Sequence, residues 1–299
     1  MKNLQCILPL LIFACSCGEP TIDIPDYIPK LAVDGYIEVG KPPLIYLTYS
    51  SAFISDYDSL DFVNLVKLNV AAYVITEEGD TIGFTRRTNT DEFPPFKYTT
   101  SYSELVGEEG KTYDILIKKS GYDEIVASTS IPLNAPDILG IDFTMVNETD
   151  STGYYELSML NPMQPEYYFI QNKLWGERNF YPVQFPARSN RLTEKDTIVF
   201  TLFKKRNSNL WNPDYLADTT QNNTSEDVGR GYYNYTDTVI FCISTLDSKS
   251  YNVLASIFLD TEFPDNPFKG LTQLPESNVS NGIGRWTGMN SVIKTVVNK

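Results

Sequence analysis

Short segments in which apolar and polar residues alternate are the feature that most constrains how this chain folds. Such segments recur along the chain, for example at residues 30–38, 43–49 and 110–118. Alternation of this kind indicates half-buried β-strands, because successive side chains of a strand point to opposite faces of a sheet. The turn signal Glu-Glu-Gly-Asp at residues 77–80 favours a hairpin between two of them. The sequence therefore predicts a mainly β fold.

A proline-bounded joint at residues 132–136 divides the predicted strands into two groups. Residues 31–133 are predicted to form an immunoglobulin-like antiparallel β-sandwich, because short strands succeed one another there without a helical period between them. Residues 137–299 are predicted to form a second β-rich sandwich or barrel-like domain. This second domain includes one short helix near residues 248–260, which Asp247 caps.

Residues 1–16 have the composition of a bacterial lipoprotein signal peptide. A lysine near the start, a short apolar core and small residues precede a cysteine. The apolar core is too short to cross a membrane, which takes about 20 apolar residues. We expect cleavage before Cys17 and lipidation of that residue, with Cys15 as the alternative because apolar and small residues precede it at the same spacing. Residues 17–30, which contain three prolines, would then form an extended lipid-anchored tether.

The residue content excludes several classes of function. The chain has no histidine, which excludes Ser-His-Asp triads, Cys-His dyads and His-ligated zinc or iron sites. Only Cys17 and Cys242 remain after the predicted cleavage, so lipidation of Cys17 excludes a disulfide framework. The net charge of -14 at pH 7 repels phosphate backbones and makes nucleic acid a poor partner.

A long segment without hydrophobic periodicity, residues 207–234, is rich in Asn, Asp, Thr and Gly. A loop of this length in a folded domain is either functional or mobile. Four aromatic residues in or beside it are candidate ligand-binding residues, because aromatic rings stack on sugars and on aromatic ligands. Packing in a core is the alternative for each of them. The four candidates are Trp211, Tyr232, Tyr233 and Tyr235.

Three further motifs resemble functional patterns but favour a structural interpretation. Gly282 and Gly284 lack the third glycine and the helix of a nucleotide-binding loop, so we expect a strand bend where two backbones approach closely. Ser291 and Lys294 have the Ser-x-x-Lys spacing, but the valines and isoleucine around them favour a strand, which puts the two side chains on opposite faces. The three aspartates of residues 56–61 favour a solvated turn over a calcium site. We therefore predict no metal site and no cofactor.

Eight segments share their order and spacing with a known family. They are residues 17–25 (Cys-Gly-Glu-Pro-Thr-Ile-Asp-Ile-Pro), 31–37, 43–51, 110–117, 131–132, 266–268, 277–279 and 281–284. In this order they resemble the Bacteroidota lipoproteins with the domain of unknown function 4249. The resemblance covers essentially the whole mature chain and departs at residues 285–288, Arg-Trp-Thr-Gly, where members usually have an aromatic residue and a second glycine.

This resemblance implies an outer-membrane lipoprotein, often encoded beside a TonB-dependent receptor, and it supplies no catalytic residues. Asp followed by Ser or Thr and a small or aliphatic residue also recurs, as at residues 80–82 and 237–239. That pattern resembles the O-glycosylation acceptor of Bacteroidota, and turn chemistry at the start of strands is the alternative.

Three hypotheses about function follow. The leading one is a non-catalytic binding or accessory subunit of a TonB-dependent transporter, anchored by its N-terminal lipid in the outer membrane and facing the cell surface. A surface hydrolase with paired carboxylates is the second, and a structural or adhesive envelope lipoprotein is the third. The lack of histidine and of a nucleophile motif disfavours an enzyme. The sequence does not identify the small ligand.

Overall fold

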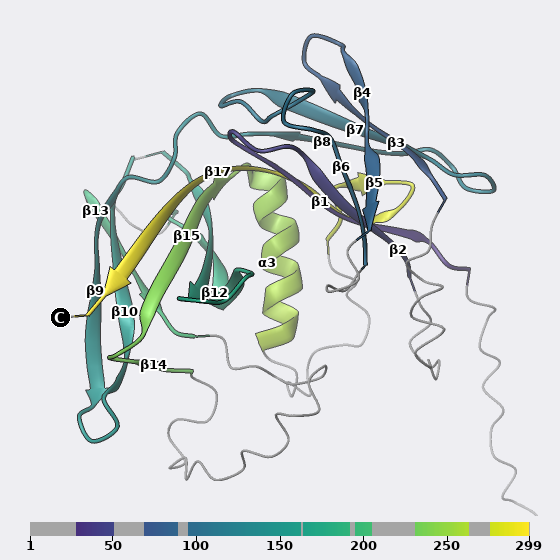
Figure 1. Cartoon of the computed structure of the whole chain (residues 1–299). Helices are drawn as coiled ribbons and strands as arrows, with labels where there is room; N and C mark the ends of the chain where they lie inside the picture. Colours follow the sequence, from purple (N-terminus) through teal and green to yellow (C-terminus); the bar gives the residue numbers. More distant parts are fainter. Residues whose placement is uncertain are drawn as a thin grey trace, which may run out of the picture. The chain divides into compact units, whose positions relative to one another are not determined.

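The computed structural model describes residues 28–50, 69–88, 95–162, 164–191, 195–204, 231–262 and 276–298. Within these residues the chain forms several β-sheets and one helix, so the predicted mainly β fold is confirmed (Figure 1). The predicted signal peptide, both candidate lipidation residues, most of the predicted tether and Trp211 lie outside them. So do the three aspartates of residues 56–61.

The largest sheet combines strands from both ends of the chain. Its eight strands are, in spatial order, β12 (Tyr181–Ser189), β11 (Tyr167–Leu174), β15 (Thr238–Leu246), β17 (Ile283–Val297), β1 (Leu31–Glu38), β2 (Leu44–Tyr49), β6 (Phe96–Thr99) and β5 (Thr85–Thr88).

Two smaller sheets accompany the large one. The five-stranded sheet has the order β16 (Val279–Ser280), β8 (Ile125–Ser130), β7 (Thr112–Lys118), β3 (Ala71–Thr76) and β4 (Thr81–Gly83). In the four-stranded sheet, β10 (Thr152–Leu160) pairs with β13 (Thr197–Leu202), β14 (Tyr233–Asn234) and β9 (Ile138–Asn147).

The first core fills the space between the five-stranded sheet and the β1–β2 part of the large sheet. Alternation in the sequence builds it: in β7 the side chains of Tyr113, Ile115 and Ile117 are buried, and the residues between them are more exposed. Trp286 of β17 is fully buried here and its Nε1 donates to the carbonyl oxygen of Tyr113 at 2.9 Å. The first core comprises Leu31, Val33, Ile37, Ile45, Leu47, Ala72, Val74, Tyr98, Tyr113, Ile115, Ile117, Ile125, Ala127, Ile131, Val279 and Trp286.

The second core lies between the four-stranded sheet and the β11–β15 part of the large sheet. The ring of Tyr155 packs edge-on against Tyr233 and Phe241, with ring centroids 5.0 and 5.2 Å away. The second core comprises Tyr155, Leu157, Met159, Tyr168, Ile170, Val183, Ile198, Leu202, Tyr233, Val239, Phe241 and Ile243.

Helix α3 (Ser248–Glu262) occurs where the sequence predicted a helix, and Asp247 caps it as expected. Asp247 Oδ1 accepts from the backbone N–H of Ser250 at 2.8 Å, and Oδ2 accepts from the Ser250 hydroxyl at 2.9 Å. Oδ2 also accepts from Thr129 of β8 at 2.6 Å, which ties the helix to the five-stranded sheet. Buried Leu254 packs with Phe169 on the large sheet.

Strand β17 connects the two groups of strands (Figure 1). Residues 283–289 pair in parallel with β1, and residues 289–297 pair antiparallel with β15. The pairing therefore crosses the predicted boundary at residues 132–136, although the buried residues of the two cores come mainly from opposite sides of it. The sequence predicted a strand around Ser291 and Lys294 and a strand bend at Gly282 and Gly284, but it did not predict one continuous strand or a parallel neighbour for β1.

The start of β17 needs glycine. Gly284 has a φ of +113°, and a Cβ at that position would lie 1.9 Å from the carbonyl oxygen of Val33. This confirms the expected close approach of two backbones. The next residue, Arg285, pairs with Asp34 across the strands, with Nε 2.6 Å from Oδ1. Residues 285–288, where the sequence departs from the family resemblance, thus supply part of the pairing that joins β17 to β1.

The remaining motifs have structural positions. Ser291 and Lys294 both lie in β17, as predicted, and the Ser291 hydroxyl is 2.8 Å from that of Ser244. Thr81 and Thr238, in two of the Asp-Thr motifs, are the first residues of β4 and β15, which suits turn chemistry. In the part of the chain that is described, no helix is both long enough and apolar enough to span a bilayer.

Candidate functional site

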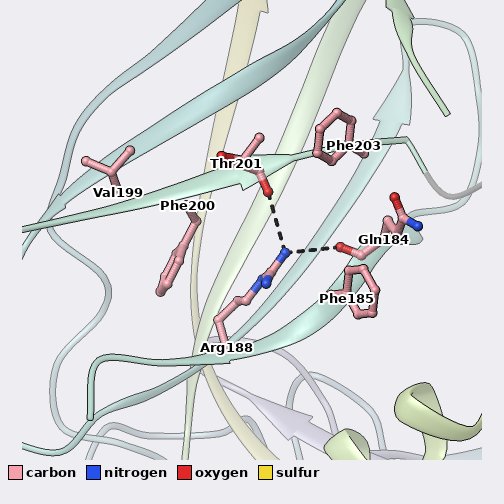
Figure 2. Close-up of a pocket in the computed structure, with 7 residues that line it drawn as sticks. All are labelled: Gln184, Phe185, Arg188, Val199, Phe200, Thr201 and Phe203. Carbon is pink, nitrogen blue, oxygen red and sulfur yellow. Dashed lines mark hydrogen bonds between the residues drawn. The ribbon is translucent and has the colours of Figure 1, made fainter. Parts of the chain in front are cut away.

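A hollow of about 320 Å³ lies between β12 and β13 (Figure 2). Three phenylalanines and a valine form its apolar wall, and an arginine, a glutamine and a threonine supply its polar groups. The residues that line it are Gln184, Phe185, Arg188, Val199, Phe200, Thr201 and Phe203.

A bulge in β12 shapes one side of the hollow. Phe169 of β11 pairs with Ala187 and Gln171 pairs with Pro182, so one residue of β11 stands opposite four residues of β12. The bulged residues turn towards β13, where the Gln184 N–H donates to the carbonyl oxygen of Phe203 at 3.0 Å. β-Bulges of this kind bend a strand and redirect its side chains.

Phe185 lies within this bulge in an unusual backbone conformation. Its φ is +52°, in the left-handed region that a bulky side chain rarely adopts. Such a conformation costs roughly 1 to 3 kcal/mol and persists only where surrounding contacts enforce it. This backbone conformation places the Phe185 ring beside the guanidinium of Arg188, with the ring centroid 5.7 Å from Arg188 Cζ.

Arg188 lies between two aromatic rings. Its Cζ is also 5.9 Å from the ring centroid of Phe200 on β13. Its Nη2 donates to the backbone carbonyls of Gln184 and Thr201 at 3.4 and 3.5 Å, longer than the usual 2.7–3.2 Å. Figure 2 shows the guanidinium pointing between the β13 strand and the bulge. The hollow therefore combines a fixed cation with apolar walls.

The predicted aromatic candidates fall in different places. Tyr232 is half-buried, and its ring lies 5.9 Å from that of Phe203, which lines the hollow. Tyr235 is half-buried too, but it packs on Phe143 with ring centroids 5.5 Å apart. Trp211 is not among the described residues. Among the three described candidates, Tyr232 is the one that the structure brings near the hollow.

Tyr233 requires a correction. Its side chain is fully buried in the second core, so it presents no surface to a ligand. Its hydroxyl accepts a hydrogen bond from Asn172 Nδ2. Burial raises the pKa of the Tyr233 phenol, which keeps the hydroxyl neutral. Tyr233 instead packs in a core, which was the alternative interpretation, because its position in β14 turns the ring inwards.

The residues that line the hollow were not among the sequence candidates. Val199, Phe200 and Thr201 lie in β13, and nothing in the alternation of this strand marks a site. Strand β12 itself was not predicted, since Pro182 and Pro186 interrupt it. Two prolines four residues apart in an aromatic segment are typical of an edge strand or a bulge. These prolines were the signal in the sequence that could have indicated the bulge.

Comparison with known families agrees with the resemblance found in the sequence. The model of the domain of unknown function DUF4249 matches residues 19–295. The chain belongs to this family. No curated protein matches the DUF4249 chain.

Two solved structures align with much of the DUF4249 chain at low similarity. One is a DUF4785 family protein from Legionella pneumophila, with 11% identity, coverage of 73% of this chain and 52% of that chain, and a TM-score of 0.23. The other is the native conformation of E. coli alpha-2-macroglobulin, with 9% identity, coverage of 77% and 14%, and a TM-score of 0.23. The chain spans about half of the first protein and far less of the second. TM-scores this low carry no inference about fold or function.

Proposed function

We propose that this DUF4249 protein is a lipid-anchored, non-catalytic binding or accessory subunit of a TonB-dependent transporter at the outer-membrane surface. The observation that carries the proposal is the family match over residues 19–295, together with the signal-peptide pattern that precedes it. The apolar hollow with its fixed cation supports a binding role, because small-molecule sites are concave and mostly apolar, with few polar groups.

A short segment of the sequence separates the proposed lipidation site from the first described strand. The first described strand begins at Leu31, which leaves residues 17–29 between the proposed lipid and the folded part. A segment of this length spans at most roughly 45 Å when fully extended. The proposed tether would therefore let the folded part reach a neighbouring transporter while the lipid stays in the membrane.

The anchor is tested by two cysteine variants. Cys17→Ala is expected to abolish lipidation and to release the protein from outer-membrane fractions, whereas Cys15→Ala is expected to leave both unchanged. The reverse pattern would assign the lipid to Cys15. Retention of both variants in the membrane, with no mass increase from acylation in the unsubstituted protein, would contradict the lipoprotein proposal.

The transporter partnership is tested by a native pull-down from outer membranes, followed by mass spectrometry. The affinity tag follows a flexible linker after Lys299, because the Asn298 side chain bonds to Tyr155 at 3.0 Å and to the Tyr235 carbonyl at 2.8 Å. A stoichiometric TonB-dependent receptor is the expected result. Recovery of the protein without a receptor, from membranes that yield other receptor complexes intact, would contradict the proposal. It would leave the hydrolase and adhesion hypotheses to be tested.

A further inference from the structure

We propose that the hollow between β12 and β13 binds a small organic carboxylate with a flat apolar group, and that Arg188 pairs with the carboxylate. This deepens the binding role proposed above and rests on it, but it does not depend on the transporter partner. Three features of the hollow support it: the position of the cation, the nature of the walls and the enforced backbone of the bulge.

The position of Arg188 favours a carboxylate. The guanidinium is a planar fork of N–H groups that matches the two oxygens of a carboxylate. Arg188 Nη2 donates to the Gln184 and Thr201 carbonyl oxygens at 3.4 and 3.5 Å, which is long for a hydrogen bond. A carboxylate forms shorter, charge-assisted bonds of about 2.7–2.9 Å with such a group. An anion at this point therefore gains more from Arg188 than the neutral carbonyls do.

The walls of the hollow favour a ligand with a flat apolar part. Phe200 and Phe203 are half-buried, and Val199 is 54% exposed at the rim. Covering this apolar surface stabilises a complex, because it removes the rings and the valine from water. The volume of about 320 Å³ is at the lower end for ligand sites, which selects a small molecule. An inorganic anion would leave these walls wet.

The bulge holds the cation in place before a ligand arrives. Phe185 keeps its positive φ of 52° while its ring lies beside Arg188, and Phe200 lies beside the guanidinium too (Figure 2). A side chain restrained in this way loses little rotamer freedom on binding, which is the main benefit of a preorganised site. Strain at this position is thus consistent with a site for recognition.

Calorimetric titration of the purified, full-length lipidated protein tests the proposal. Phenylacetate is the probe, and 2-phenylethanol, acetate and inorganic phosphate are the comparison probes, each lacking either the charge or the apolar ring. Titrations at about 0.15 M salt limit the screening length to about 8 Å, which reduces the repulsion from the net charge of -14. Phenylacetate is expected to bind at least about tenfold more tightly than each comparison probe.

Variants place the binding in the hollow. Arg188→Met is expected to weaken phenylacetate binding at least about tenfold, and Arg188→Lys to weaken it less. Arg86→Met is the matched control, because Arg86 lies over the ring of Phe96 at 5.2 Å beside the first core, and it is expected to bind as the unsubstituted protein does. Circular dichroism of each variant checks that it is folded.

Substitution at the exposed rim keeps the test decisive if Arg188→Met does not fold. Val199→Glu places a negative charge at the rim and is expected to weaken phenylacetate binding, whereas Val199→Lys is expected to retain or strengthen it. Equal binding of phenylacetate and 2-phenylethanol, no binding of any probe, or insensitivity to both rim charges would overturn the proposal. A receptor in the pull-down without phenylacetate binding would refute this inference alone, and binding without a receptor would refute the transporter partnership alone.

Discussion

The two cores of this protein are built from different chemistry. The first core is largely aliphatic around one tryptophan, whose indole N–H is satisfied by a backbone carbonyl. The second core is rich in tyrosine, and its buried hydroxyls bond to side chains: Tyr168 to Glu166 at 2.8 Å, Tyr155 to Asn298 at 3.0 Å, and Tyr233 to Asn172. Shape therefore specifies the first core, whereas hydrogen bonds add specificity to the second.

The difference matters because one strand serves both cores. Trp286 near the start of β17 lies in the first core, and Val296 near its end packs on the second. Side-chain bonds reinforce this connection, since Asn290 donates to the carbonyl of Pro132 at 3.1 Å and Thr245 donates to that of Asn134 at 2.7 Å. We infer that two chemically distinct cores unfold as one cooperative unit, and the predictions below challenge that view.

The largest effect is expected from Trp286→Ala. Removing a fully buried tryptophan leaves a cavity in the first core and should lower the free energy of unfolding by about 3–5 kcal/mol. Urea denaturation followed by circular dichroism measures it. Trp175→Ala, at a residue 74% exposed, is the matched control and should change stability by less than about 0.5 kcal/mol. If Trp286→Ala lowers the free energy of unfolding no more than Trp175→Ala does, then Trp286 does not stabilise the first core as described.

Gly284→Ala should act on the strand that joins the cores. A methyl group 1.9 Å from the Val33 carbonyl oxygen, at a φ of +113°, should cost about 2–4 kcal/mol from strain and overpacking. Gly83→Ala is the control, because a Cβ there meets nothing within 4 Å. The same denaturation experiment compares the two. Equal stabilities would show that β17 does not depend on its close approach to β1.

Tyr233→Phe should reveal the hydrogen-bonded character of the second core. It keeps the ring but leaves the buried Asn172 amide without this partner, at a cost of about 1–3 kcal/mol. Tyr102→Phe, at a residue 72% exposed, should be neutral. If thermal unfolding gives the same midpoint for both variants, then packing alone accounts for the second core.

Alkaline pH should affect the cores through their phenols. Burial raises the pKa of Tyr168, Tyr155 and Tyr233 above that of an unfolded chain. Because the unfolded chain releases these protons first, the contribution of these phenols to stability should be constant below about pH 10 and should be lost as the pH rises beyond it. Urea midpoints across this range measure the slope. Tyr168→Phe should reduce the slope, and an unchanged slope would exclude this phenol as a cause.

The local structure was largely predictable, because it depends on neighbouring residues. Alternation placed strands such as β7, and Asp247 with the helical spacing that follows it placed α3. The pairing of β1 with β17 was not predictable, since alternation shows which face of a strand is buried and not which distant strand lies beside it. The hollow could not be predicted for a similar reason. It forms where a bulge near Phe185 meets β13, and the bulge and β13 come from two separate segments of the chain.

Cooperativity is tested most directly by native-state hydrogen exchange with mass spectrometry on the unsubstituted protein and on Ile115→Val. Ile115 lies in the first core, and this substitution should lower stability by about 1 kcal/mol. The account predicts that the slowest amides of β7 and of β10 exchange with the same free energy of opening, and that both lose the same amount in Ile115→Val. Loss of protection in β7 with unchanged protection in β10 would contradict it, because the two cores would then open independently despite sharing β17.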